Sequence, residues 1–101
     1  MKKYIVYTKE KGKIETVVYS DFSDLTWHRL DGPAYQKFYS NGQLGCIIYY
    51  TNGKLHRLDG PTYREFYDNG KLNYEQYYIN GNPYYKSEYA AEIFKMKLAL
   101  L

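Results

Sequence analysis

Cysteine and proline are scarce in this 101-residue chain, which has one of the former and three of the latter. The single cysteine, Cys46, excludes an internal disulfide, and a lack of disulfides is typical of a reducing compartment. No apolar run approaches the roughly 18 residues of a membrane span. The apolar stretch after the two amino-terminal lysines ends at Tyr7, too early for a signal peptide. We therefore expect a cytoplasmic protein that does not associate with membranes.

An excess of one charge is also missing. The 14 Lys and Arg residues and 11 Asp and Glu residues give a net charge of +3, and no five like charges stand together. A dedicated nucleic-acid binder usually carries a denser basic patch, so nucleic acid is the less favoured partner. The 2 histidines and 1 cysteine lack the spacing of a zinc site. We expect neither a metal nor another cofactor.

Tyrosine, in contrast, is abundant. The chain has 15 tyrosines, and aromatic residues make up 20% of it. Tyrosine favours strands and combines an apolar ring with a polar tip. This composition is typical of sheets with one apolar and one wetted face, in a single domain with a modest core.

One phrase occurs twice: "HRLDGPAYQKFYSNG" begins at His28 and "HRLDGPTYREFYDNG" begins at His56. Asn-Gly pairs share this 28-residue offset and lie at 41–42, 52–53, 69–70 and 80–81. Each pair predicts a two-residue type I′ turn, because both residues accept a positive φ. The Asp-Gly pairs at 31–32 and 59–60 predict two further reversals. The pattern predicts a mainly β fold: a single antiparallel β-meander of tandem 28-residue hairpin repeats, with about seven to nine short strands.

The turn positions also predict the strand register. A two-residue loop at 41–42 places Tyr35 opposite Ile48, and the same counting places Arg64 opposite Glu75 as an ion pair on the other face. Counting from both sides conflicts near residues 58–61, which predicts a bulge or a wider turn there. We expect one face of the two hairpins to be buried, with side chains from Tyr35, Tyr39, Leu44, Cys46, Ile48, Tyr63, Tyr67, Leu72 and Tyr74.

We expect one domain over residues 1–101. Its predicted parts are a degenerate half repeat (1–26), a first repeat (27–54), a second repeat with an end strand (55–86) and a helix (87–101). The helix should begin after Ser87 as N-cap and cover the open end of the sheet as a C-terminal cap. Its predicted apolar stripe is Ala90, Ile93, Phe94, Lys97 by its stem, and Leu101.

The repeated HRLDGP phrase has two interpretations. In the structural one, Asp31 and Asp59 accept backbone N–H bonds, while Gly32 and Gly60 supply a positive φ. The arginines would reach a carbonyl or the same aspartate, and the histidines would pack against tyrosine rings. In the alternative, donors suited to phosphate or carboxylate come from His28, Arg29, His56 and Arg57.

We expect no enzymatic activity and no catalytic residues. His-Arg-Leu-Asp is similar to a kinase catalytic loop, but the glycine loop, the strand lysine and the metal-binding aspartate of a kinase are missing. Cys46 stands between Gly45 and Ile47 in a predicted strand and reads as a small core residue.

Three pairs of adjacent tyrosines place one ring on each side of the sheet. Rings from Tyr49, Tyr77 and Tyr84 are candidates for a binding surface. Exposed tyrosines give contact area at low entropic cost, for a protein partner or for stacked bases.

The tandem "DGPA...Y.NG" and "Y..NG" phrases, over residues 27–85, resemble the variant form of the membrane occupation and recognition nexus (MORN) repeat. The chain lacks the Tyr-Glu-Gly-x-Trp phrase of the eukaryotic form, so the resemblance does not imply membrane binding. Such repeats occur in bacterial antitoxin-like or immunity proteins and in phage and viral proteins. They are binding scaffolds that bring no catalytic residues.

The resemblance implies a protein-binding module that acts by occlusion, as an inhibitor, an antitoxin or a phage anti-defence protein. Its partner would be a toxin or a host factor, in the host cytoplasm if the source is viral. The alternative is a binder of a small anionic ligand such as a nucleotide, or of single-stranded nucleic acid, through tyrosine rings and His-Arg donors. An open one-layer sheet also leads us to expect a homodimer.

Overall fold

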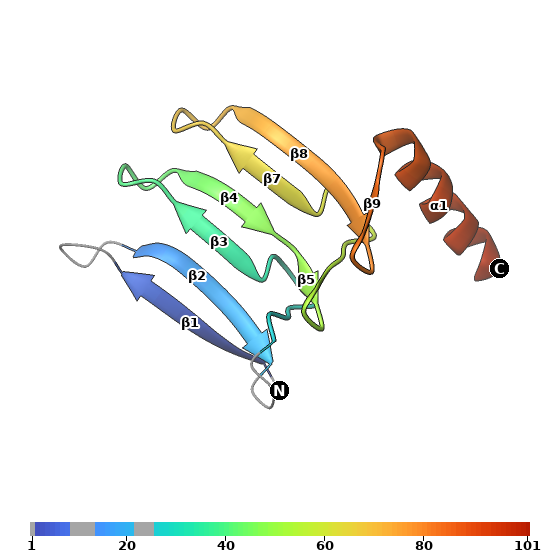
Figure 1. Cartoon of the computed structure of the whole chain (residues 1–101), viewed down its shortest axis with the longest axis horizontal. Coiled ribbons are helices and arrows are strands. Elements are labelled where there is room, and N and C mark those ends of the chain that lie inside the picture. Colours follow the sequence, from blue (N-terminus) through green and yellow to red (C-terminus); the bar gives the residue numbers. More distant parts are fainter. Residues whose placement is uncertain (1, 9–13, 22–25) are drawn as a thin grey trace.

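A computed structural model of the chain describes residues 2–8, 14–21 and 26–101. The fold is mainly β with one helix at its carboxyl-terminal end (Figure 1). The elements are β1 (Lys2–Thr8), β2 (Ile14–Asp21), β3 (Tyr35–Phe38), β4 (Leu44–Ile48), β5 (Tyr50–Thr51), β6 (Lys54–Leu55), β7 (Tyr63–Phe66), β8 (Leu72–Ile79), β9 (Asn82–Tyr84) and α1 (Lys86–Ala99).

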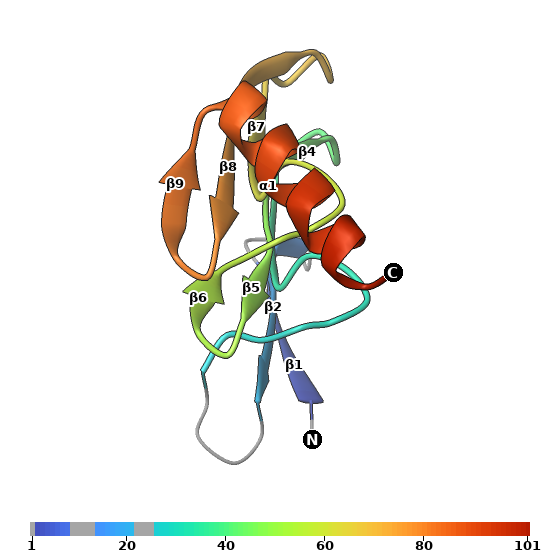
Figure 2. The same cartoon turned by 90° about the vertical axis from the view of Figure 1, so that its right-hand side faces the viewer.

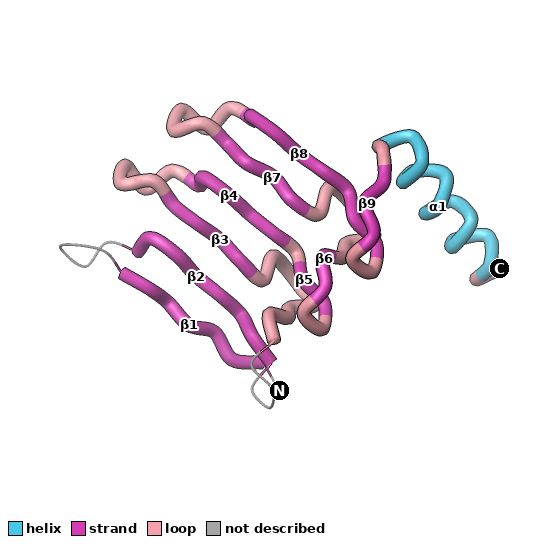
Figure 3. Tube along the Cα trace, in the orientation of Figure 1, coloured by secondary structure: helices cyan, strands magenta, loops and turns pink. Residues whose placement is uncertain are grey.

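The main sheet has the order β1-β2-β3-β4-β7-β8-β9, and every pairing in it is antiparallel (Figure 3). Its last strand, β9, pairs only with the second half of β8. β5 and β6 form a separate two-stranded sheet. The expectation of an antiparallel β fold is confirmed, but the single continuous meander is wrong, because one hairpin leaves the main sheet between β4 and β7.

Two of the four Asn-Gly pairs form the expected turn. Asn52 and Asn80 have φ of 50° and 49°, and the glycines that follow them have 78° and 83°. These values are those of a type I′ turn. Both turns close the short hairpins, β5–β6 and β8–β9.

At the other two pairs, 41–42 and 69–70, only the glycine has a positive φ, so the type I′ prediction is wrong there. Gly42 N donates to the carbonyl of Tyr39 at 2.9 Å, and Tyr39 N donates to the carbonyl of Gln43 at 2.8 Å. The loop therefore holds three residues, as in hairpins that follow a type I turn with a left-handed residue. The Asn41 side chain accepts the N–H of Gln43 at 2.9 Å, which favours this local turn.

The predicted register is confirmed despite the longer loop. Tyr35 lies opposite Ile48, although the loop is one residue longer than expected. A register shift beside Phe38 compensates for the extra loop residue. Arg64 lies opposite Glu75, and its Nε donates to the carboxylate at 3.0 Å, as expected.

The core is small. Among the described residues the buried hydrophobic side chains are Val18, Ala34, Ile48, Ile79 and Tyr89. The hairpin face expected to be buried is covered only in part, because Tyr39, Tyr67, Leu72 and Tyr74 are 40% to 50% exposed. In the part of the chain that the structure describes, no second layer packs against that end of the strands (Figure 2). A single-layer sheet leaves such side chains in contact with water.

The helix begins two residues earlier than predicted, with Tyr85 rather than Ser87 as N-cap. The Glu88 carboxylate accepts the N–H of Tyr85 at 3.1 Å, which satisfies a donor at the helix start. The predicted stripe is also wrong, because Phe94 is 63% exposed, and the buried helical residue is Tyr89. At 14 residues, α1 is too short to cross a membrane, and no other described segment forms a helix that could.

Candidate functional site

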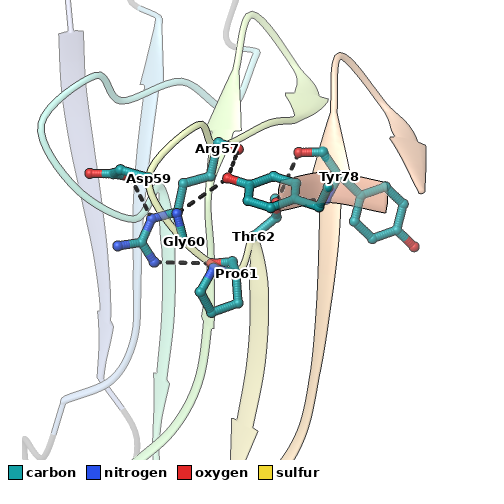
Figure 4. Close-up of polar contacts among 7 residues, drawn as sticks. Arg57, Asp59, Gly60, Pro61, Thr62 and Tyr78 are labelled. Atoms are coloured by element: carbon teal, nitrogen blue, oxygen red, sulfur yellow. Dashed lines mark hydrogen bonds and ion pairs between the residues drawn. The ribbon is translucent and has the colours of Figure 1, made fainter. Parts of the chain in front are cut away.

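Arg57 organises the second HRLDGP loop (Figure 4). Its Nε donates to Asp59 at 2.8 Å, and its Nη1 donates to the carbonyl of Pro61 at 3.0 Å. The guanidinium carbon lies 4.0 Å from the centre of the Tyr49 ring, a cation–π contact. One side chain thus connects both ends of the loop to Tyr49, which lies between β4 and β5. The hydrogen bond from Arg57 lowers the pKa of the Asp59 carboxyl.

The first loop has the same kinds of contact, made by the arginine 28 residues earlier. Arg29 donates to Asp31 at 3.0 Å and to the carbonyl of Pro33 at 3.2 Å, and its guanidinium lies 3.9 Å from the Tyr19 ring centre. The expectation that the arginines reach a carbonyl or the same aspartate describes both loops. For Asp59 the main partner is the Arg57 side chain, rather than the backbone amides that the sequence suggested.

Gly32 and Gly60 also share a requirement that the sequence did not predict, the close approach of an arginine. Gly60 has the expected positive φ, at 158°, whereas Gly32 does not. A Cβ at Gly32 would lie 2.8 Å from Cζ of Arg29, and one at Gly60 would lie 2.9 Å from Cζ of Arg57. Only glycine lets the guanidinium pack this close to the chain.

The histidines hold turns. Nδ1 of His28 accepts the N–H of Asn52 at 2.9 Å, and Nδ1 of His56 accepts the N–H of Asn80 at 3.0 Å. Each imidazole therefore bonds to one of the two type I′ turns. The sequence did not predict these hydrogen bonds, and the expected packing of histidine on tyrosine rings stays a prediction.

Tyr89 of α1 joins the helix to the second loop. Its hydroxyl donates to the carbonyl of Arg57 at 2.6 Å and accepts the N–H of Gly60 at 3.2 Å. Its ring lies 4.6 Å from the ring of Tyr77. Tyr19, Tyr49 and Tyr77 are thus covered in turn by Arg29, Arg57 and Tyr89. Burial raises the pKa of the Tyr89 hydroxyl.

A groove of about 450 Å³ lies between the two loops. It is lined by residues 29–32 of the first loop, residues 56–59 of the second, and Tyr49 and Thr51. We call it the loop groove. Four of the predicted binding residues meet here, namely Arg29, Tyr49, His56 and Arg57. The lining includes two arginines and two aspartates, so these charges balance.

The other predicted binding residues lie elsewhere. His28 is bonded to its turn, and Tyr77 lies under Tyr89. Tyr84 borders a separate groove with Glu88, Glu92 and Lys95 of the helix. The seven residues therefore do not form a single site.

Sequence reasoning missed two leucines beside the loop groove. Leu30 is 75% exposed and Leu58 is 44% exposed, and both line the groove. A leucine between a charged pair in a turn phrase has no strand in which to be buried. Its presence in both copies of the phrase was the available signal.

The sheet face that carries Tyr35 has a second groove, of about 440 Å³. Two cross-strand rows run through it: Tyr35, Ile48 and Tyr63 in the first, and Lys37, Cys46 and Glu65 in the second. We call the surface formed by these six residues the aromatic face. Trp27 borders the same groove and stacks on Tyr35 with the ring centres 5.3 Å apart.

Polar groups on the aromatic face are bonded to one another. The Tyr63 hydroxyl donates to Glu65, which raises the pKa of Tyr63. Burial raises the pKa of the Cys46 thiol, which keeps it protonated and a poor nucleophile. In the described part of the chain no group of three His, Cys, Asp or Glu side chains could hold a metal ion.

Comparison with family models, with curated proteins and with solved structures found no match to this chain.

Proposed function

We propose that the protein is a non-enzymatic protein-binding module, and that its partner docks along the loop groove. The observation that carries the proposal is the state of the two arginines. Each guanidinium is bonded to an aspartate and a carbonyl in its own loop and is stacked on a tyrosine. An anionic ligand would have to compete with these internal contacts.

The surface around the groove suits a protein. Leu30 and Leu58 offer exposed apolar contacts, one from each loop. Balanced charges beside exposed apolar side chains are usual at protein interfaces, whereas phosphate sites carry an excess of positive charge. A partner that is covered in this way, such as a toxin or a host-defence factor, would be inhibited by occlusion.

We further infer that the two HRLDGP units are tandem copies of one MORN-like repeat, with α1 as the end cap. Four side-chain hydrogen bonds of the first unit support this inference, because they recur 28 residues later at comparable distances. The arginine of each unit also stacks on a tyrosine. Tyr89 takes the place over Tyr77 that an arginine takes over Tyr19 and Tyr49.

Affinity capture with matched variants tests the function. The native chain, a Leu30→Ser/Leu58→Ser double variant and a Leu100→Ser control would be immobilised and exposed to lysate of the native cell or its host. Leu100 is 87% exposed on the helix end, away from the groove. A partner identified by mass spectrometry would then be purified and titrated. We expect the double variant to bind at least about tenfold more weakly and the control to bind as the native chain does.

The anionic-ligand alternative predicts a different result. A nucleotide or a short oligothymidylate would bind saturably, more weakly as salt is raised, and would depend on Arg29 and Arg57. Calorimetric titration of ATP and of the oligonucleotide at low and moderate salt tests this. Saturable binding that is lost in Arg29→Gln/Arg57→Gln, while the leucine variant binds normally, would contradict our proposal.

A further inference from the structure

The loops and the helix leave the aromatic face uncovered, although Trp27 stacks on Tyr35 and Ile48 is buried there. Tyr49 and Tyr77 carry Arg57 and Tyr89 on the opposite side, because Tyr49 follows Ile48, and side chains alternate along a strand. The loops and the helix therefore cover the side away from Tyr35. On the aromatic face Lys37 is exposed, and the neighbouring Tyr74 is 48% exposed.

The charges of this face have a twofold pattern. Lys37 on β3 lies opposite Cys46 on β4, and Cys46 lies opposite Glu65 on β7. A lysine and a glutamate thus flank Cys46 at equal strand spacing. In the adjacent row Tyr35 and Tyr63 flank Ile48 in the same way.

Such a surface is complementary to itself. If a second copy is laid face to face on the first and turned about an axis along β4, Lys37 of each copy meets Glu65 of the other. The same operation brings Tyr35, with Trp27 stacked on it, toward Tyr63 of the other copy and places Cys46 near the axis. Rotation about an axis across the strands would instead set like charges over each other. The charges therefore select one of the two face-to-face arrangements.

We propose that the aromatic face binds a second copy of this chain, in a twofold dimer whose axis runs along β4. The broad dimensions of the molecule, 51 × 36 Å at a thickness of 20 Å, leave room for the roughly 800 Å² per partner of a stable interface. Sheets packed face to face lie about 10 Å apart and would enclose the small core from both sides. This dimer goes beyond the proposed function, and it leaves both loop grooves open on the outer sides.

Charge reversal tests the arrangement. Lys37→Glu gives a copy with glutamate at positions 37 and 65, and Glu65→Lys gives a copy with lysine at these two positions. Sedimentation velocity at about 100 µM should show a dimer for the native chain and at least about tenfold weaker association for each variant alone. An equimolar mixture of the two variants should dimerise again, because every facing pair is then opposite in charge. Lys95→Glu on the helix, 74% exposed at its side chain, serves as the control.

Cys46 gives an independent readout. Two cysteines near the axis on sheets about 10 Å apart are too distant for a disulfide, but a short bis-maleimide can join them. We expect cross-linked dimer from the native chain and none from Cys46→Ser. A monomeric native chain, unimpaired single variants, or a mixture that stays monomeric would overturn the proposed dimer. None of these results affects the leucine test of the loop groove.

Discussion

At the scale of single residues, the Arg57 side chain makes three separate contacts that hold its loop. Its guanidinium donates hydrogen bonds to an aspartate and to a backbone carbonyl and, at the same time, stacks on a tyrosine ring. A planar guanidinium with several donors can do this, whereas a lysine ammonium cannot stack flat and fork in the same way. The loop therefore depends on guanidinium geometry more than on positive charge.

Arg57→Lys should accordingly lower the free energy of unfolding by about 1–2 kcal/mol. Urea titration followed by the fluorescence of Trp27 measures it. Arg29→Lys should act in the same direction, because its contacts are the same within a few tenths of an ångström. Lys95→Gln, which removes an exposed ion pair of 3.8 Å, is the control and should change stability by less than about 0.5 kcal/mol. An unchanged midpoint for both arginine variants would contradict this role.

The aspartate of the same loop gives a pH-dependent prediction. Arg57 lowers the pKa of Asp59 in the folded protein, below the value of about 3.9 for an unfolded chain. The ionised carboxylate thus stabilises the fold above about pH 4, and this contribution is lost as the pH falls through the lower folded pKa. Asp59→Asn should be less stable than the native chain at pH 6, and the difference should shrink toward pH 2.

Unfolding midpoints measured at several pH values test this. Because the Asp59 side chain is 86% exposed, we expect a small effect, best seen as a trend. Asp68→Asn is the matched control, since Asp68 forms no ion pair among the described residues. A difference between Asp59→Asn and the native chain that stays constant down to pH 2 would show that the charge of Asp59 has no role.

At the scale of elements, the attachment of α1 depends on one hydroxyl. Tyr89→Phe keeps the ring on Tyr77 but removes both the donor to the Arg57 carbonyl and the acceptor for Gly60 N–H. We expect a loss of about 1–2 kcal/mol in stability, together with faster amide exchange in the first turns of α1 and at Gly60. Hydrogen-exchange mass spectrometry measures the second effect.

Tyr85→Phe is the control for Tyr89→Phe. Tyr85 is 80% exposed, so its hydroxyl is already solvated. The control should leave both stability and exchange unchanged. If Tyr89→Phe also leaves the exchange of α1 unchanged, the helix is held by ring packing alone.

The sequence allowed the strand elements to be predicted better than the helix. Asn-Gly turns and side-chain alternation are local signals, so the antiparallel register around Tyr35 and Ile48 followed from them. Whether an Asn-Gly pair forms a two-residue or a three-residue loop depends on its neighbours, as the side-chain bond of Asn41 illustrates. The helix face could not be predicted, because Tyr89 is buried against a loop some 30 residues earlier, a contact without periodicity.

The candidate site was predictable in its residues but not in their roles. HRLDGP was identified from its repetition, and four of the predicted binding residues do border one groove. The packing of Gly60 under the Arg57 guanidinium could not be seen, because glycine reads first as a turn residue. The strand register places Lys37, Cys46 and Glu65 in one row. This charge pattern could not be recognised from the sequence, because its members lie on three strands and are separated along the chain.

At the scale of the whole molecule, the fold is a broad layer only 20 Å thick with a handful of buried hydrophobic side chains in its described part. Hydrophobic burial stabilises a fold in proportion to the apolar area removed from water, so a single layer gains little. A second copy on the aromatic face would remove further apolar area from water without any change in the fold. The dimer and the stability of the sheet should therefore be linked.

Linkage makes the thermal midpoint depend on concentration. Because only folded chains form the dimer, raising the protein concentration favours the folded state by mass action. We expect the midpoint of the native chain to rise by several degrees between about 1 µM and 100 µM, and that of Lys37→Glu to stay constant. Differential scanning fluorimetry at a series of concentrations measures this, with Lys95→Glu expected to follow the native chain. A native midpoint that is independent of concentration would mean that each sheet is stable alone, and that its small core suffices.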